Sequence, residues 1–379
     1  MIKFNVPNRS SLDGKYLGQL LNDHEAKFSG DGPYSKKCSQ LIETMLGGGK
    51  ALLTTSCTDA LEMAAILCDI KEGDEVIMPS FTFVSTANAF VLRGAKLVFI
   101  DIRPDTLNID ETLIEAAITP KTKAIVVVHY AGVACEMDEI LAVANRLNVP
   151  VIEDAAQAYW SFYRGRPLGS FGKFATFSFH ETKNIHCGEG GALIVNDPQS
   201  IRRAEIIREK GTNRSEFVRG EVDKYTWLDI GSSFLPSELN SAYLLGQLEQ
   251  AKDTTDRRLK IWENYFSALE PLEKKGFIKL PKVPSHCKHN GHIFALTLQT
   301  ECARDDLKSH LRESGIESAS HYVPLHSSPA GQSFGRFFGK DTYTTDLSLR
   351  LLRLPLHSHI EAGSPENIVK SIFAFFGVK

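Results

Sequence analysis

The chain has 379 residues, of which 42% are apolar and 23% are charged. This composition is typical of a folded globular protein and excludes a largely disordered one. Lys and Arg total 43 and Asp and Glu total 46, so the formal charge is −3. Nucleic-acid-binding proteins are normally basic, so we expect no nucleic-acid partner. At ~150 residues per domain, the length predicts two domains, or one large domain with a satellite.

The first half of the chain alternates segments of helical and strand periodicity. A helix is expected over residues 59–68, where Leu61, Ala64, Ala65 and Cys68 share one face. Apolar runs of strand length follow at 75–78, 96–100, 124–128, 149–152, 175–179 and 192–195, with further helices at 85–93, 111–118 and 137–147. Val- and Ile-rich strands separated by helical crossovers predict an α/β protein, with a mostly parallel sheet covered on both faces.

After about residue 245 the pattern changes. A long polar helix is expected at 247–269, an alternating strand at 292–298, and helices at 305–314 and 365–376. Strands and helices that are separated rather than alternating indicate a smaller α+β domain. We therefore expect a large domain over residues 1–245 and a small C-terminal domain over 246–379.

The chain shows no sign of export, membrane insertion or metal binding. No apolar stretch approaches the ~20 residues needed to span a bilayer, and residues 1–7 lack the apolar core of a secretory signal. The seven cysteines are scattered and form no C-x-x-C pair, which is typical of the reducing cytoplasm. The group His286, Cys287, His289 and His292 fits no standard zinc spacing, so we expect no metal site.

Three motifs carry candidate chemistry. Small hydroxyl residues at 54–58 precede the first predicted helix, where free backbone N–H groups can bind phosphate, although a plain helix cap is the commoner explanation. The pair Glu153 and Asp154 closes a strand, where ligands of open α/β sheets bind, although a capping Asp is slightly favoured for this motif alone. Lys183 follows another strand and is a candidate Schiff-base lysine, whereas most lysines are solvated surface charges. Together the three match the phosphate seat, acidic partner and lysine that pyridoxal 5′-phosphate requires.

The order of these motifs resembles the DegT/DnrJ/EryC1 sugar aminotransferases, a family of fold-type I pyridoxal-phosphate enzymes. The resemblance covers essentially the whole chain and is most specific at residues 79–89, 128–132, 153–157 and 178–184. It implies a large domain with a mostly parallel, mixed sheet flanked by helices, plus a smaller C-terminal α+β domain. It also implies a homodimer whose active sites lie at the subunit interface.

The resemblance further implies roles for the matching residues. Lys183 would bind the cofactor and then act as general base, and Asp154 would hold its pyridine nitrogen protonated. Gln157 would lie near the ring's phenolic oxygen, and Phe83 would stack on the ring. The phosphate would be held by Ser56, Cys57 (through its backbone N–H), Thr58 and Ser178.

One position departs from the family pattern. The family sends an Asn from the partner subunit to the phosphate, in a segment that matches residues 231–239 here. The matching position is Leu235, which has no polar group to offer. Ser232 or Ser233 is therefore the candidate substitute.

Residues 208–214, 223–227 and 321–326 resemble the members of the family that aminate C4 of dTDP-4-dehydro-6-deoxy-D-glucose with L-glutamate. That reaction gives the 4-amino-4,6-dideoxygalactose product for surface polysaccharide of the enterobacterial common antigen type. Lys210 and Arg214 would then bind the diphosphate, and His180 would orient the sugar. Tyr322 and His326 would lie near the sugar site. The alternatives are a solvated loop for the charged run and structural packing for residues 321–326.

Other functions are weighed against this one. In sugar dehydratases of the same fold a histidine replaces the lysine, so the presence of Lys183 argues against them. A non-catalytic regulator that binds the cofactor or a sugar nucleotide is disfavoured, because the lysine, the aspartate and the phosphate residues are all retained. The same amination giving the C4 gluco epimer remains open.

Overall fold

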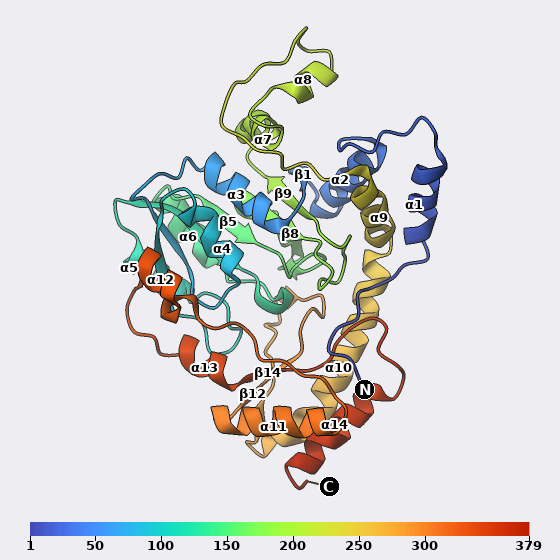
Figure 1. Cartoon of the computed structure of the whole chain (residues 1–379). Coiled ribbons are helices and arrows are strands. Elements are labelled where there is room, and N and C mark those ends of the chain that lie inside the picture. The colour runs from blue at the N-terminus through green and yellow to red at the C-terminus, as the bar shows by residue number, and fades with distance from the viewer. Residues whose placement is uncertain (379) are drawn as a thin grey trace.

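The computed structural model describes residues 1–378 and is built around an eight-stranded sheet (Figure 1). The strand order is β1-β9-β8-β5-β4-β2-β3-β13. Only β9 runs antiparallel to its neighbours in this sheet, so the sheet is mixed but mostly parallel, as expected. The strands are β1 (Lys50–Thr54), β2 (Glu75–Pro79), β3 (Lys96–Ile100), β4 (Thr122–Val128), β5 (Val151–Asp154), β8 (Phe174–Ser178), β9 (Gly191–Val195) and β13 (Gly335–Phe337).

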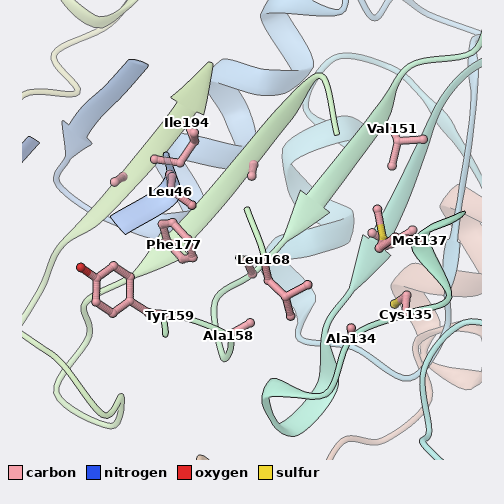
Figure 2. Close-up of a cluster of buried hydrophobic side chains, with 14 of the residues drawn as sticks. Leu46, Ala134, Cys135, Met137, Val151, Ala158, Tyr159, Leu168, Phe177 and Ile194 are labelled. Carbon is pink, nitrogen blue, oxygen red and sulfur yellow. The ribbon is translucent and has the colours of Figure 1, made fainter. Parts of the chain in front are cut away.

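Alternation of side chains places a hydrophobic cluster on each face of this sheet. In β4, Ile125 and Val127 belong to one cluster and Ala124 and Val126 to the other, because successive residues of a strand point to opposite faces. Figure 2 shows part of the first cluster, with Phe177 among its members. That face is covered by α2 (Pro33–Leu46) and α6 (Met137–Arg146), and the second face by α3 (Cys57–Leu67), α4 (Val84–Val91) and α7 (Ile201–Arg208).

Two predicted helices differ from the observed ones. The segment 111–118 is a 3₁₀ turn, η1 (Glu111–Leu113), followed by α5 (Ile114–Ala117), and the Asp110 side chain caps it by accepting from Thr112 N. The single helix expected at 247–269 is two helices, α9 (Glu238–Glu249) and α10 (Ala251–Lys274). They meet at Gln250, whose φ of −105° and ψ of 13° leave the helical region. Apolar periodicity continues across this break, so the sequence pattern conceals it.

The C-terminal part has its own antiparallel sheet, β10 (Ile278–Lys279), β12 (Ala295–Leu298) and β14 (Leu351–Arg353). Helices α10, α11 (Glu301–Glu313) and α14 (Ser364–Phe375) pack on it around a separate hydrophobic cluster. Residues from both ends of the sequence cross between the two parts. Phe4 N donates to Glu317 at 2.8 Å, and β13 adds a parallel strand to β3 of the large sheet. The boundary expected near residue 245 falls inside α9 and stays a prediction.

The remaining elements are short or peripheral. They are α1 (Asp13–Asn22), α8 (Arg214–Val218), α12 (Pro329–Phe334), α13 (Thr344–Arg350), η2 (Tyr130–Gly132), η3 (Pro198–Ser200), η4 (Leu325–Ser327), and the third sheet of β6 (Phe162–Tyr163), β7 (Arg166–Pro167) and β11 (Cys287–Lys288). Over residues 1–378, no helix combines the length and the hydrophobicity that crossing a membrane requires.

Candidate active site

A cavity of about 700 Å³ lies between the large sheet and the C-terminal sheet. Val128, Asp154 and Ser178 line it from one side, and these are the last residues of the parallel strands β4, β5 and β8. Arg353, the last residue of β14, lines it from the other side. The volume falls within the range of ~300–1,000 Å³ that is usual for sites holding a cofactor or small ligand.

Asp154 is held in one orientation at the floor of this cavity. Its carboxylate accepts a hydrogen bond from Thr86 Oγ1 at 2.7 Å and another from Ala156 N at 3.1 Å. Thr86 lies in α4 and also contacts Thr82 Oγ1 at 2.8 Å. Asp154 is only 5% exposed, so its orientation is set by these donors rather than by water.

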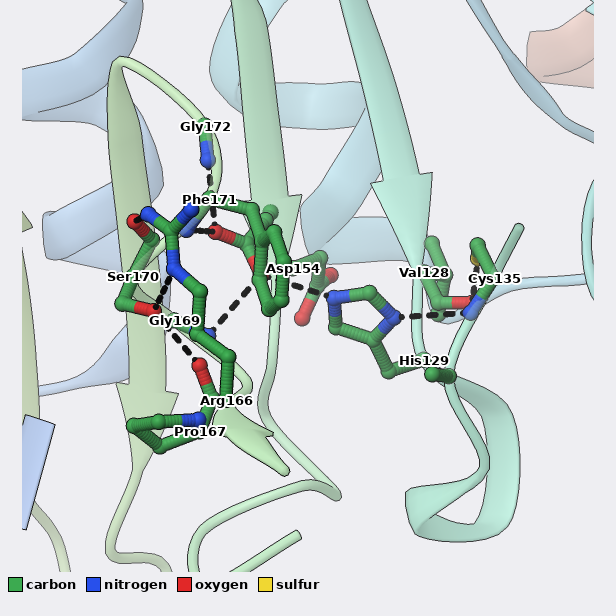
Figure 3. A network of polar contacts seen from close by, with 12 residues as sticks. Val128, His129, Cys135, Asp154, Arg166, Pro167, Gly169, Ser170, Phe171 and Gly172 are labelled. Atoms are coloured by element: carbon green, nitrogen blue, oxygen red, sulfur yellow. Dashed lines mark hydrogen bonds and ion pairs between the residues drawn. The ribbon is translucent and has the colours of Figure 1, made fainter. Parts of the chain in front are cut away.

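The neighbouring Glu153 has a different role, because it points to the opposite face of the sheet. Glu153 accepts hydrogen bonds from the backbone N–H groups of Gly169, Phe171 and Gly172 at 2.7 to 2.8 Å. It also lies 3.0 Å from His129 Nε2. Figure 3 shows this network and labels its partners His129, Gly169, Phe171 and Gly172. Burial alone would raise the pKa of Glu153, but these hydrogen bonds lower it overall. Glu153 therefore fixes the loop of residues 169–172, whereas Asp154 lines the cavity.

Lys183 lies on the connection between β8 and β9. Its backbone N–H donates to His180 O at 2.9 Å, and bonds such as Phe179 N to Gly190 O at 2.8 Å close the loop. Burial lowers the pKa of the Lys183 amine, and the charge of Arg353 lowers it further, against opposing effects of Cys57 and Asp154. A lowered pKa increases the share of unprotonated, nucleophilic amine at neutral pH.

The start of α3 is a candidate anion site in the same cavity as Lys183. Ser56 caps the helix by accepting from Asp59 N at 3.1 Å, and Thr58 Oγ1 donates to Ser85 Oγ at 2.8 Å. Ser56, Cys57 and Thr58 all line the cavity. The first N–H groups of a helix have no partner within the helix, so they are available to bind an anion. A Cβ at Gly191 would clash with the backbone of Ser56 and Cys57, so β9 can approach the helix start only because this residue is glycine.

We expect Gly191→Ala to weaken cofactor binding, because the added methyl group must push the start of α3 out of place. Overpacking of this kind costs about 1–3 kcal/mol, which corresponds to roughly a 5- to 150-fold loss of affinity for pyridoxal phosphate if it falls on the phosphate site. Gly14→Ala is the control, since a Cβ there meets nothing within 4 Å. Fluorescence titration of both variants with the cofactor checks the prediction, and equal affinities would contradict it.

Aromatic residues form the wall near the predicted ring position. Gln157 Nε2 donates to Tyr322 Oη at 2.8 Å, and the Phe83 and Tyr322 rings lie 6.5 Å apart between centroids. Tyr130 Oη lies 2.8 Å from His321 Nδ1. Burial lowers the pKa of His321 to about 2, so this imidazole is neutral.

Most of the site residues expected from the sequence meet in this one cavity. They are Ser56, Cys57, Thr58, Phe83, Asp154, Gln157, Ser178, His180, Lys183 and Tyr322. His180 lies at its edge, 2.9 Å from Thr182 Oγ1 and 3.5 Å from Glu189.

Four expected residues lie outside the cavity in the single chain. Lys210 and Arg214 both pair with the buried Glu209, at 3.7 and 2.8 Å. His326 lies 2.7 Å from Ser80 Oγ and 3.1 Å from Asp341. Ser232 O accepts a hydrogen bond from Lys210 N at 2.9 Å. Their roles toward the substrate and the phosphate stay predictions.

Thr86 and Arg353 line the cavity and were not expected as site residues from the sequence. Thr86 was inside a recognised stretch, but nothing in the sequence pairs it with Asp154. Arg353 lies in the apolar run 351–356, where a lone charge in a buried strand was an available signal. Within residues 1–378, no group of three or more His, Cys, Asp or Glu side chains is arranged to hold a metal ion.

The fold, the strand-end carboxylate, the lysine and the anion site define an α/β enzyme of the pyridoxal-phosphate type. The chain belongs to the DegT/DnrJ/EryC1/StrS aminotransferase family, whose model matches residues 15–373. It is accordingly a sugar aminotransferase, and its cofactor is pyridoxal 5′-phosphate.

Individual relatives agree over nearly the whole length. The spore coat polysaccharide biosynthesis protein SpsC of Bacillus subtilis is 32% identical, with 97% of this chain and 96% of SpsC covered. The aminotransferase TlmJ from Streptoalloteichus hindustanus superposes with a TM-score of 0.90 at 26% identity, covering 100% of this chain and 99% of TlmJ. Helicobacter pylori PseC, an aminotransferase involved in the biosynthesis of pseudoaminic acid, has a TM-score of 0.88 at 25% identity, with 99% of each chain covered.

Proposed function

We propose that the protein transfers the amino group of L-glutamate to C4 of dTDP-4-dehydro-6-deoxy-D-glucose. The products are dTDP-4-amino-4,6-dideoxy-D-galactose and 2-oxoglutarate, for surface polysaccharide of the enterobacterial common antigen type. The observation that carries the proposal is the placement of Lys183, Asp154 and the start of α3 around one cavity. Tyr322, from the stretch 321–326 that the resemblance assigns to the sugar site, also lines this cavity. SpsC and PseC, which act in polysaccharide and pseudoaminic acid biosynthesis, support a sugar substrate.

The residues of the cavity divide the work of the reaction. Bound pyridoxal phosphate supplies a ring that withdraws electrons from the donor's Cα. Asp154, oriented by Thr86, keeps a proton on the ring nitrogen. The N–H groups at the start of α3 hold the phosphate. Lys183 holds the cofactor at rest, and its freed amine takes the proton from the donor's Cα; its lowered pKa suits it to that role.

The proposal includes a homodimer in which each subunit completes its partner's site. Residues 214–230 form a segment around α8 that projects from the body of the chain (Figure 1). It exposes large apolar side chains: Phe217, Val218, Tyr225, Trp227, Leu228 and Ile230. Large exposed apolar side chains gathered in one segment are typical of an interface. Arg214 begins this segment, and Lys210 and Ser232 flank it in the sequence. Light scattering is expected to give about twice the 42.0 kDa mass, and a fully active monomer would contradict this part. A cytoplasmic location stays a prediction.

The substrate is tested by supplying this ketosugar with L-glutamate and recording the H3–H4 coupling of the product by NMR. A small coupling is expected, because the galacto product carries an axial amine. A large coupling would mean the gluco epimer. Amination of a 3-keto or UDP-linked sugar instead, with none of the proposed substrate, would reject the substrate and leave the sugar aminotransferase class intact.

A further inference from the structure

Arg353 is a half-buried cation that lines the cavity, and no carboxylate within residues 1–378 forms an ion pair with it. Its Nη2 donates to Ser320 O at 2.9 Å, whereas its Nε is buried and has no hydrogen-bond partner. Burial lowers the pKa of the Arg353 guanidinium, and the Tyr130 and Tyr322 hydroxyls oppose this effect; no carboxylate within residues 1–378 contributes. Its guanidinium lies 4.9 Å from the Phe4 ring centroid, which supports the plane of the group without using its N–H donors.

The second arginine that lines the cavity, Arg258, has its donors engaged within the protein. Arg258 Nε donates to Gly291 O at 3.0 Å, and its Nη2 donates to His292 O at 2.8 Å. Those bonds join α10 to the loop before β12, so Arg258 has a structural role. Within residues 1–378, the side chain of Arg353 makes its hydrogen bond through Nη2 alone, so an anion entering the cavity would compensate a charge that the protein leaves unpaired.

We propose that Arg353 binds the α-carboxylate of the amino donor, an inference that rests on the proposed transfer from an amino acid. A guanidinium presents two parallel N–H groups that match the two oxygens of a carboxylate. Arg353 is thereby a substrate-binding residue of the first half-reaction, in which the donor gives up its amino group.

The position of Arg353 favours this anion over the diphosphate of a sugar nucleotide. The donor's α-carboxylate is bonded to the same carbon as the amine, and that amine must reach the cofactor beside Lys183. The carboxylate therefore falls within two bonds of the reacting nitrogen. Arg353 lies in the same cavity as Lys183, at the end of strand β14. Its neighbours Leu352 and Leu354 are at most 1% exposed, which fixes the backbone there. The charge of Arg353 also lowers the pKa of Lys183. The diphosphate is separated from the reacting C4 by the sugar ring and must lie further out.

The test separates the two half-reactions in the cofactor-loaded enzyme. Stopped-flow absorbance follows the loss of the pyridoxal band with L-glutamate, and separately its return when the pyridoxamine form meets the ketosugar. Arg353→Gln is expected to raise the half-saturating glutamate concentration about 100-fold, as loss of one partner of a buried charge pair does, and to leave the ketosugar half within about 2-fold. Arg353→Lys, which keeps the charge but not the fork, should fall between.

A binding readout accompanies the rates. L-2-methylglutamate lacks the Cα proton, so its spectral titration reports binding without proton transfer, and Arg353→Gln should weaken it by the same factor. Arg350→Gln is the matched control, because Arg350 pairs with Asp346 outside the cavity. Thermal melting and cofactor affinity of each variant establish that the fold is retained; if Arg353→Gln does not fold, Arg353→Lys carries the test.

Each outcome decides something. Weakening confined to the ketosugar half would assign Arg353 to the sugar nucleotide and overturn the proposal, as would unchanged glutamate binding or equal loss in both halves. If the wild-type pyridoxal band responds to no amino acid among glutamate, glutamine and alanine, the proposed function itself fails, and this inference fails with it. If the wild type reacts with L-glutamate and Arg353→Gln binds glutamate equally well, the inference about Arg353 is refuted and the proposed function stands.

Discussion

Lys183→Ala is expected to abolish turnover, by about 10⁴-fold or more, while leaving the fold intact. The lysine amine is both the attachment point of the cofactor and the proposed proton acceptor, and general base catalysis alone contributes ~10²–10⁴-fold. The fold should survive because the bond from its backbone N–H to His180 O does not involve the side chain. Steady-state assays and a circular dichroism melt of the purified variant measure both effects.

A second lysine provides the control for this experiment. Lys173 lies on the surface, 41% exposed, and pairs with Asp197 at 3.2 Å. Exposed ion pairs of this kind contribute about 0–1 kcal/mol, so Lys173→Ala should keep activity near the wild-type level. Turnover near wild type in Lys183→Ala would remove Lys183 from the mechanism.

Asp154→Asn should slow the chemical step by about 10²–10³-fold, the usual effect of removing one preorganised electrostatic stabiliser. Asparagine matches aspartate in size and can still bond to Thr86, so cofactor binding should be retained in part. It carries no negative charge, however, so it cannot hold a proton on the ring nitrogen. Measuring kcat together with the cofactor dissociation constant separates these contributions.

Glu153→Gln is the comparison within the same motif. Glu153 binds three backbone N–H groups and contacts His129 on the opposite face of the sheet, so its loss should lower the melting temperature. The folded fraction should keep a kcat near that of the wild type. If Asp154→Asn also kept its kcat and lost only cofactor affinity, Asp154 would be an anchor for the ring rather than an electrostatic catalyst.

The elements that the sequence predicted well are those whose burial is uniform. Strands β2 to β5 lie between two helical layers, so their apolar runs carry a strong local signal. The break at Gln250 was missed because helical periodicity does not record a single residue that leaves the helical region. Strand β13 was missed as well, since three residues at an edge carry little pattern of their own.

The candidate site was predictable where its residues follow strands, and less so elsewhere. Asp154 and Lys183 come after apolar runs at recognisable positions, so motif order indicated them. The same motif could not show that the side chains of Glu153 and Asp154 have different roles, because those roles depend on what packs against each face of the sheet. Lys210 and Arg214 lie inside the recognised stretch 208–214, yet in the single chain they pair with Glu209.

Local chemistry in the sequence determined the family and the cofactor and indicated the candidate site residues, because strand ends, helix starts and a lysine in a turn are contiguous motifs. Tertiary structure alone decided what surrounds them. Thr86 in helix α4 donates to Asp154 at the end of strand β5, and Gly191 lets β9 meet the start of α3. Arg353 arrives from the C-terminal sheet with donors unused. Such pairings depend on the packing of segments far apart in the chain, and no local pattern of residues encodes which distant groups will meet.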